Sequence, residues 1–380
     1  MVRSKIKTLG IVAVLMVLSV LALYFAQALL MPKYMSNVKE GALIAEYYKA
    51  PKNNDVIFIG DCEVYENISP VTLWQEYGIT SYIRGSAQQL IWQSYYLLEE
   101  TLRYETPKVV VFNVLSMKYN EPQNEAYNRM TLDGMKWSDS KAASIRASMT
   151  EKESFISYVF PLLRFHSRWS ALTKEDFRYM FSKDMVSYNG YLLQTKRKGV
   201  TTQPRKTPLA DYSFGENAWD YLDKITQLCK EKNIRLVLMK APTIYPVWYD
   251  EWEEQIKDYA AQKDLPYYNF LESIQESGID LTTDTYDAGL HLNVWGAEKL
   301  SRYFGQILRT ECDLPDHRQD SAVLSYWKND MKQRKEQQID EKILDNGAVY
   351  CSDRNFTCRL RHSIRQQCKK SAERLHFYHR

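Results

Sequence analysis

The chain has 380 residues, of which 45% are hydrophobic and 26% charged, with a formal net charge of +3. This length accommodates one large domain with a sizeable core, or two smaller ones. Because acidic and basic residues nearly balance, the composition lacks the basic excess that is typical of nucleic-acid-binding proteins, and we expect no nucleic-acid partner.

The N-terminus carries the clearest physical signal. No charged residue occurs from residue 9 to residue 31, where Leu, Val, Ala and Met dominate. Roughly 20 apolar residues suffice to cross the hydrocarbon layer of a membrane, so we expect one transmembrane helix. Arg3, Lys5 and Lys7 precede it, which favours a cytoplasmic N-terminus and an extracytoplasmic remainder.

A cleaved signal peptide is the alternative, with Ala26 and Ala28 as small residues near a cleavage site. Signal-peptide apolar cores usually run only about 7–15 residues, so the length of this run favours an uncleaved anchor. The expected protein is therefore a single-pass cell-membrane protein, with residues 1–32 as its cytoplasmic tip and anchor.

Apolar runs and helical periods alternate over residues 33–312, which we interpret as one domain. Strands are predicted at 55–60, 79–83, 108–115, 234–239 and 266–270, and helices at 88–104, 216–232, 248–262 and 294–308. Strands separated by helices predict a parallel sheet covered on both faces, the three-layer α/β/α architecture of flavodoxin-like folds.

Two regions depart from this alternation. Residues 117–214 are richer in charged and aromatic residues and contain helical pieces at 141–149 and 153–163, so we expect a helical insertion after the third strand. Ligands bind at the carboxyl ends of strands in open α/β sheets, where such an insertion can wall the site. Residues 313–380 are polar and are expected to form a disordered or weakly helical tail.

Two short polar segments carry the candidate chemistry. Gly60, Asp61 and Cys62 follow the first predicted strand, and Asp287 precedes His291 just before the last predicted helix. These segments open at the same edge of a parallel sheet, so they can meet although they are far apart in the sequence. A nucleophile needs a base within hydrogen-bond reach, and the base needs an orienting acid. The alternatives are a buried structural cysteine and a histidine that only caps or packs.

Together the segments resemble those of the SGNH, or GDSL-like, hydrolase family. In that family the nucleophile is a serine in a Gly-Asp-Ser motif after strand one, and a segment near the C-terminus supplies an acid and a histidine. The resemblance covers residues 55–308 without the insertion. It implies a catalytic triad of Cys62, His291 and Asp287, with cysteine in place of the usual serine.

The resemblance also implies an oxyanion hole. The family places a glycine after strand two and an asparagine after strand three, and Gly85 and Asn113 occupy those places here. With the Cys62 backbone N–H, they would supply three donors. The glycine that normally precedes the asparagine is missing, so Asn113 could equally be a buried strand residue.

Two departures from the family leave alternatives open. The acid lies four residues before the histidine, and Asp284 competes with the preferred Asp287 as the orienting carboxylate. The cysteine could form a thiol acyl-enzyme, favour transfer over hydrolysis, or mark an inactive relic; because cysteine is a strong nucleophile, inactivity is not the default.

Three further polar residues near the expected site are candidates for substrate binding. These are Asp61, Lys240, which ends the fourth predicted strand, and Asn293, which starts the last predicted helix. No nucleotide-binding or HExxH motif occurs, so we expect neither a metal nor another cofactor.

The sequence therefore predicts an acyl-ester hydrolase or acyltransferase that acts on acetyl or D-alanyl groups of a cell-envelope glycopolymer. The expected partners are a polysaccharide or teichoic-acid-like polymer, the membrane, and an acyl-donor protein in the membrane. A non-catalytic glycan-binding envelope protein is the alternative, because fold does not settle function.

Overall fold

The computed structural model describes residues 2–32, 43–181 and 185–345. The chain divides into two compact units, Met1–Lys332 and Gln333–Arg380, and the first contains the whole sheet. The expected polar tail lies outside the described residues from residue 346 onward.

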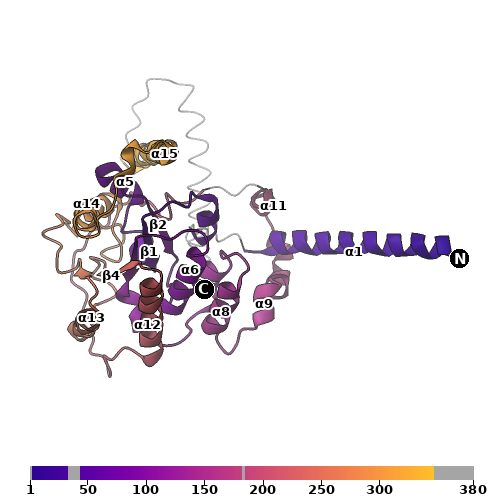
Figure 1. Cartoon of the computed structure of the whole chain (residues 1–380), viewed down its shortest axis with the longest axis horizontal. Helices are drawn as coiled ribbons and strands as arrows, with labels where there is room; N and C mark the ends of the chain where they lie inside the picture. The colour runs from indigo at the N-terminus through magenta and orange to yellow at the C-terminus, as the bar shows by residue number, and fades with distance from the viewer. Residues whose placement is uncertain (1, 33–42, 182–184, 346–380) are drawn as a thin grey trace, which may run out of the picture. The chain divides into compact units, whose positions relative to one another are not determined.

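The core is a five-stranded parallel sheet with the order β2-β1-β3-β4-β5. Strands β2, β1 and β4 are labelled in Figure 1. Its strands are β1 (Val56–Gly60), β2 (Ser81–Gly85), β3 (Val109–Asn113), β4 (Arg235–Lys240) and β5 (Tyr267–Asn269). The three central strands are short and apolar, as expected for strands that are buried on both faces. The predicted α/β fold class is thus confirmed.

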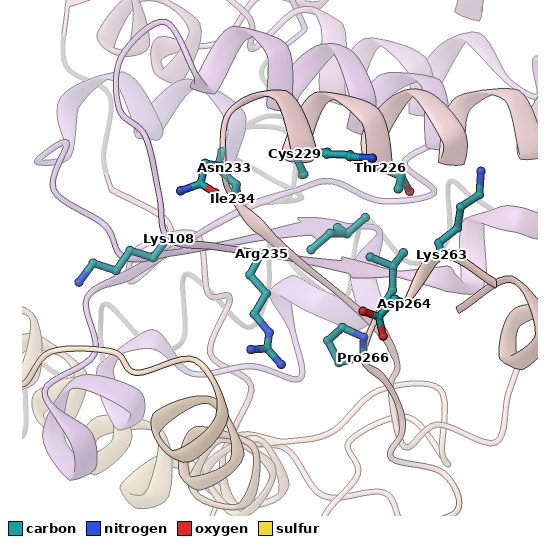
Figure 2. Close-up of a pocket in the computed structure, with 12 residues that line it drawn as sticks. Lys108, Thr226, Cys229, Asn233, Ile234, Arg235, Lys263, Asp264 and Pro266 are labelled. Carbon is teal, nitrogen blue, oxygen red and sulfur yellow. The ribbon is translucent and has the colours of Figure 1, made fainter. Parts of the chain in front are cut away.

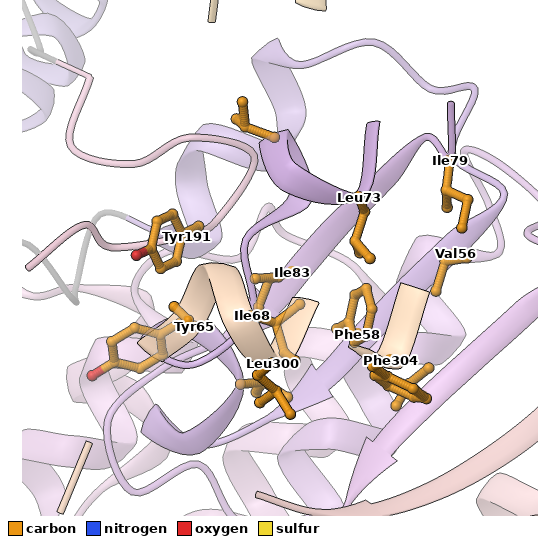
Figure 3. Close-up of a cluster of buried hydrophobic side chains, with 14 of the residues drawn as sticks. Val56, Phe58, Tyr65, Ile68, Leu73, Ile79, Ile83, Tyr191, Leu300 and Phe304 are labelled. Carbon is orange, nitrogen blue, oxygen red and sulfur yellow. The ribbon is translucent and has the colours of Figure 1, made fainter. Parts of the chain in front are cut away.

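Alternate strand residues enter two different cores, because successive side chains in a strand point to opposite faces. Phe58 and Val111 pack on the face covered by α5 (Pro70–Tyr77) and α14 (Val294–Glu311). Figure 3 shows this core, in which the rings of Phe58 and Phe304 lie 6.2 Å apart between centroids. Ile57 and Val110 pack on the opposite face, under α6 (Ile91–Thr101), α12 (Glu216–Glu231) and α13 (Asp250–Lys263).

The predicted insertion after β3 is helical. It consists of η3 (Val114–Lys118), α7 (Glu125–Leu132), α8 (Asp139–Ser148), α9 (Phe155–Val159), α10 (Leu162–Phe165), η4 (His166–Ala171) and α11 (Lys174–Phe181). Ile145 of α8 packs with Leu97 of α6 in a small separate core. The single helix expected over residues 153–163 is broken into two at Pro161, because proline cannot continue a helix interior.

The last part of the insertion, residues 186–200, returns to the core, and we call it the return segment. Its Leu192 N–H donates to Tyr65 O at 2.7 Å, beside the loop after β1. Its Lys198 N–H donates to Thr285 O at 3.0 Å, in the loop before α14. The return segment therefore ties together the two loops that carry the candidate nucleophile and the candidate histidine.

The chain begins with α1 (Val2–Leu30), and an 18-residue stretch within Ile6–Leu30 has a mean hydropathy of 2.7. This helix is long and apolar enough to span a membrane, as the sequence predicts. After it come α3 (Leu43–Glu46) and η2 (Tyr47–Lys49), which pack on the sheet through the buried Leu43 and Tyr47.

The packed unit extends beyond the boundary at residue 312 that the sequence suggested. After η5 (His317–Gln319), α15 runs over Ser321–Asp345. Leu314, Val323 and Trp327 are buried, and the Trp327 ring stacks on Trp74 at 5.8 Å between centroids. Because residues 313–345 are mostly polar, their overall composition did not reveal that these few apolar residues are buried.

Candidate active site

The carboxyl edge of the sheet gathers the candidate residues. Gly60 of β1 is paired in register with Gly85 of β2, and Asn113 ends β3 directly beside them. A Cβ atom on Gly60 would lie 2.9 Å from the Cβ of Asn113, so only glycine permits this approach. Ligand sites form at this edge in open parallel sheets.

Cys62 begins α4 (Cys62–Tyr65), a single turn that follows β1. Asp61 caps this turn, because its Oδ1 accepts a hydrogen bond from the Glu63 N–H at 3.1 Å. The Cys62 side chain is half-buried, whereas the neighbouring side chains of the turn are buried. The sequence from Gly60 to Cys62 therefore builds a tight strand-to-helix corner with the thiol at its start.

His291 is held by Asp287 from the same loop. The Asp287 Oδ1 accepts from the His291 backbone N–H at 2.8 Å, and its Oδ2 lies 2.6 Å from the imidazole Nδ1. These two contacts fix both the position and the orientation of the ring. With Nδ1 bound in this way, Nε2 is the ring atom left for a nucleophile; it is buried and has no hydrogen-bond partner among the described residues.

A second carboxylate, which the sequence reasoning missed, also reaches His291. The Glu66 Oε2 lies 3.0 Å from Nδ1, and it accepts a hydrogen bond from the Tyr286 hydroxyl at 2.7 Å. The Tyr286 ring stacks beside the imidazole at 5.8 Å between centroids. The signal was the spacing from Cys62 to Glu66, because one helical turn brings such residues to the same side.

Asp284, the competing acid, is engaged elsewhere. Its Oδ2 accepts from Lys299 Nζ at 2.7 Å and from the Asp280 N–H at 2.8 Å. No contact joins it to His291 in the described part of the chain. Among the two acids that the sequence left open, Asp287 is the one placed to orient the imidazole.

Charge couples Cys62 to His291. Burial raises the pKa of the Cys62 thiol to about 11, and the Asp61 carboxylate adds to this rise, while His291 opposes it. Burial alone would lower the pKa of His291, but the charge of Cys62 and hydrogen bonding to Asp287, Cys62 and Glu66 raise it well above the ordinary value. These carboxylates therefore stabilise an imidazolium next to the thiol.

Asn113 is not free to donate in this state. Its Nδ2 donates to Asp61 Oδ1 at 3.2 Å and to Glu63 Oε2 at 3.0 Å, and it is fully buried. The oxyanion role that the sequence suggested thus requires its amide to exchange one of these carboxylates for the substrate oxygen.

Lys240 does not face a substrate. It is fully buried, and its Nζ contacts Glu63 Oε1 and Ala241 O at 2.8 Å each and Thr243 Oγ1 at 3.1 Å. A buried charge must be paired, and Glu63 supplies the pair. The structure places Lys240 behind the site, where it holds Glu63, rather than in it.

Asn293 and Asp61 are also structural. The Asn293 Oδ1 caps α14 by accepting from the N–H groups of Trp295 and Gly296, and its Nδ2 donates to Thr283 O at 2.9 Å. It is fully buried. Asp61 is nearly buried as well, and burial together with Glu63 raises its pKa to about 6. The Asp61 Oδ1 accepts from both the Glu63 N–H and the Asn113 Nδ2.

Tyr119 is a further residue that the sequence reasoning did not single out. It lies at the start of the insertion, where burial, followed by the charges of Asp61 and Cys62, raises its pKa to about 12. The start of the insertion is therefore close enough to the site to feel its charges, and its role as a wall of the site stays a prediction.

A cavity of about 790 Å³ lies elsewhere (Figure 2). Lys108, Arg235 and Pro266 line it at the amino ends of β3, β4 and β5. The strands are parallel, so this cavity is on the edge opposite Cys62 and is not part of the candidate site.

Comparisons with known proteins add little to this geometry. No protein-family model matches the chain, and no curated protein matches it. One similar solved structure is a Bacteroides fragilis protein provisionally described as an acylhydrolase. It is 13% identical, covers 74% of this chain and all of its own, and has a TM-score of 0.36. A similarity at this level identifies no activity.

Proposed function

We propose that the protein is a membrane-anchored acyl-ester hydrolase or acyltransferase that uses Cys62 as its nucleophile. The observation that carries this proposal is the arrangement of His291, whose Nδ1 is held 2.6 Å from Asp287 Oδ2, while its buried Nε2 bonds no other nitrogen or oxygen of the described residues and its pKa is raised by Cys62. A base oriented on one side and open on the other is the arrangement that nucleophilic catalysis requires.

In the proposed reaction, the reactive form is the Cys62 thiolate beside the protonated His291. The sulfur attacks the ester carbonyl carbon, the C–O bond breaks, and the imidazolium gives its proton to the departing alkoxide. Water or a sugar hydroxyl then attacks the thioester, transferring its proton back to His291, and the acyl group leaves on that acceptor. Asp287 and Glu66 stabilise the imidazolium throughout.

The oxyanion is proposed to bind between the backbone N–H groups of Cys62 and Gly85, with Asn113 joining after it releases a carboxylate. Gly85 fits this role because a Cβ there would lie 3.1 Å from Gly60 O and 3.3 Å from the Tyr65 ring. A side chain would therefore crowd the corner beside the nucleophile. One such donor is typically worth about 3–4 kcal/mol in acyl transfer.

The proposed substrate is an acetyl or D-alanyl ester of a cell-envelope glycopolymer. The support is the apolar N-terminal helix, which would hold the domain at the outer membrane surface next to such polymers. A membrane acyl-donor protein is the corresponding partner if the reaction is a transfer.

The test is hydrolysis of p-nitrophenyl acetate by the full chain in detergent, comparing wild type with Cys62→Ala and His291→Ala. Both variants are expected to lose at least about 10³-fold in kcat/KM, as for members of a catalytic triad. Cys312→Ala is the matched control, since this half-buried free cysteine lies outside the site and its loss should leave the rate unchanged.

The non-catalytic alternative makes a different prediction. If wild type and Cys62→Ser are both inactive on every ester and thioester offered, the glycan-binding hypothesis, with Cys62 as a relic, is favoured over the enzyme. If only Cys62→Ser is active, the scaffold is competent, and the high pKa of the thiol restrains it.

A further inference from the structure

The insertion carries a set of exposed apolar side chains that the active site does not use. We call this set the apolar patch; it comes from α9, α10, η4 and α11. Its members are Ile156, Phe160, Leu163, Trp169, Phe177 and Phe181, which are 47%, 49%, 56%, 72%, 52% and 79% exposed.

This concentration is local. Outside α1 and the patch, the other large hydrophobic side chains exposed in the described part of the chain are Tyr104, Trp137, Met185 and Tyr245. Soluble surfaces scatter such residues singly, whereas here all six fall within residues 156–181, and a local gathering of this kind marks a surface that binds something. The segment 152–181 also carries five Lys or Arg residues against three Asp or Glu residues.

The patch adjoins the end of the candidate membrane helix. Arg168 of η4 donates from Nη1 to the backbone carbonyls of Leu30 and Met31, at 2.7 and 2.6 Å. Leu30 is the last residue of α1, and Met31 directly follows it. The ring of Phe181 lies 6.4 Å from that of Phe25 in α1. Asp176 holds Arg168 in place through a 3.1 Å contact to Nη2.

The chain itself limits how far the domain can move from α1. Residues 31–42 separate α1 from α3, and even a fully extended chain spans at most about 3.6 Å per residue. The domain is therefore held within a few tens of ångströms of the end of α1.

We propose that the apolar patch lies in the interfacial layer of the lipid bilayer at the exit of α1. Tryptophan and phenylalanine are suited to this layer. A second copy of the chain is the competing occupant, but the continuity of the patch with the end of α1 favours lipid.

The consequence is an oriented domain. The insertion starts at the carboxyl end of β3, the sheet edge that carries Cys62, so docking the insertion on lipid sets how the site is presented to the membrane surface. This inference holds whether or not Cys62 is catalytic.

The test uses the full chain in liposomes whose phosphatidylcholine acyl chains carry bromine, which quenches tryptophan fluorescence at short range. None of the nine tryptophans lies in α1, so quenching reports on the folded domain. Trp169 and Trp137 are the two exposed tryptophans, at 72% and 53%. Trp169→Phe is the test variant and Trp137→Phe is its matched control.

The expected result is bromine-dependent quenching in wild type that falls at least twofold in Trp169→Phe and is unchanged in Trp137→Phe. Wild-type protein without bromine-dependent quenching, or quenching that Trp169→Phe leaves intact, would overturn the proposal. Trp169 emission that changes with protein concentration but not with bromine would assign the patch to a second copy instead.

Discussion

At the scale of single residues, the unusual feature is a thiol surrounded by carboxylates. Asp61, Glu66 and Asp287 all lie in or beside the Cys62–His291 pair. Negative charge opposes the thiolate but favours the imidazolium, so the pair holds its protons more tightly than the same two groups do in water. The site is therefore expected to be slow at neutral pH and faster in alkali.

This balance can be tested with Asp61→Asn. The Asn side chain keeps an oxygen for the Glu63 N–H but removes the charge that raises the Cys62 pKa. Alkylation of Cys62 by iodoacetamide, followed by peptide mass spectrometry, should rise with pH towards about 11 in wild type. In Asp61→Asn the rise should begin at lower pH, giving a roughly tenfold faster reaction at pH 8 if the pKa falls by about one unit. An unchanged profile would show that burial alone sets the pKa.

The two carboxylates on His291 should not be equivalent. Asp287 makes two contacts with His291 and Glu66 makes one, which it shares with Tyr286. We expect Asp287→Asn to lower kcat by about 10³–10⁴-fold, as loss of the orienting acid does in a serine triad. Glu66→Gln should cost far less, about tenfold. If Glu66→Gln proved the more damaging, Glu66 would be the triad acid, and steady-state kinetics of both variants decides the point.

At the scale of elements, the return segment is the connection on which the site depends. Gly190 has φ +83°, and a Cβ there would lie 2.2 Å from Ile83 O of β2. The segment has no regular secondary structure, so hydrophobic periodicity in the sequence could not reveal it.

The Gly190→Ala variant tests this element. It is expected to destabilise the full chain by about 2–4 kcal/mol, combining backbone strain with a steric clash. Gly278→Ala is the matched control, because Gly278 has φ +67° but no atom within 4 Å of the added Cβ, and it should cost only about 1 kcal/mol. Thermal melting of both variants makes the comparison. Equal losses would mean that strain alone acts at Gly190.

The elements of the sheet were predictable, and their limits were less so. Buried apolar runs predicted all five strands within about two or three residues, because few other structures bury such runs between helices. Pro161 was a signal, which the prediction did not use, that residues 153–163 form two helices rather than one. The burial of Trp327 could not be read from a polar segment, because one anchor in a charged helix leaves little periodic signal.

The sequence predicted which residues meet at the candidate site, but not the hydrogen bonds that surround them. Because the carboxyl ends of parallel strands lie at one edge of a sheet, Cys62 and His291 could be predicted to meet there. It could not show that Lys240 and Asn293 are buried and occupied, because the partners Glu63 and Thr283 come from other elements. Glu66 was missed for the same reason: its partner is 225 residues away in the sequence.

At the scale of the whole molecule, the sheet brings the loop after β1 and the loop before α14 together, as the hydrogen bond from Leu292 N–H to Asn67 Oδ1 at 2.7 Å shows directly. The N-terminal helix is long and apolar enough to span a membrane, and the apolar patch is proposed to orient the domain at that membrane. The proposed covalent chemistry at Cys62 would then take place on a domain held at the membrane surface.

The most direct test of the central claim is to trap the acyl-enzyme. The full chain is incubated with p-nitrophenyl acetate, quenched in acid within seconds, digested and analysed by mass spectrometry. The account predicts one added acetyl group on the peptide that contains Cys62, with none in His291→Ala and none on Cys229 or Cys312. Equal acetylation of the Cys62 peptide in wild type and His291→Ala, or equal acetylation of all the cysteines, would contradict it.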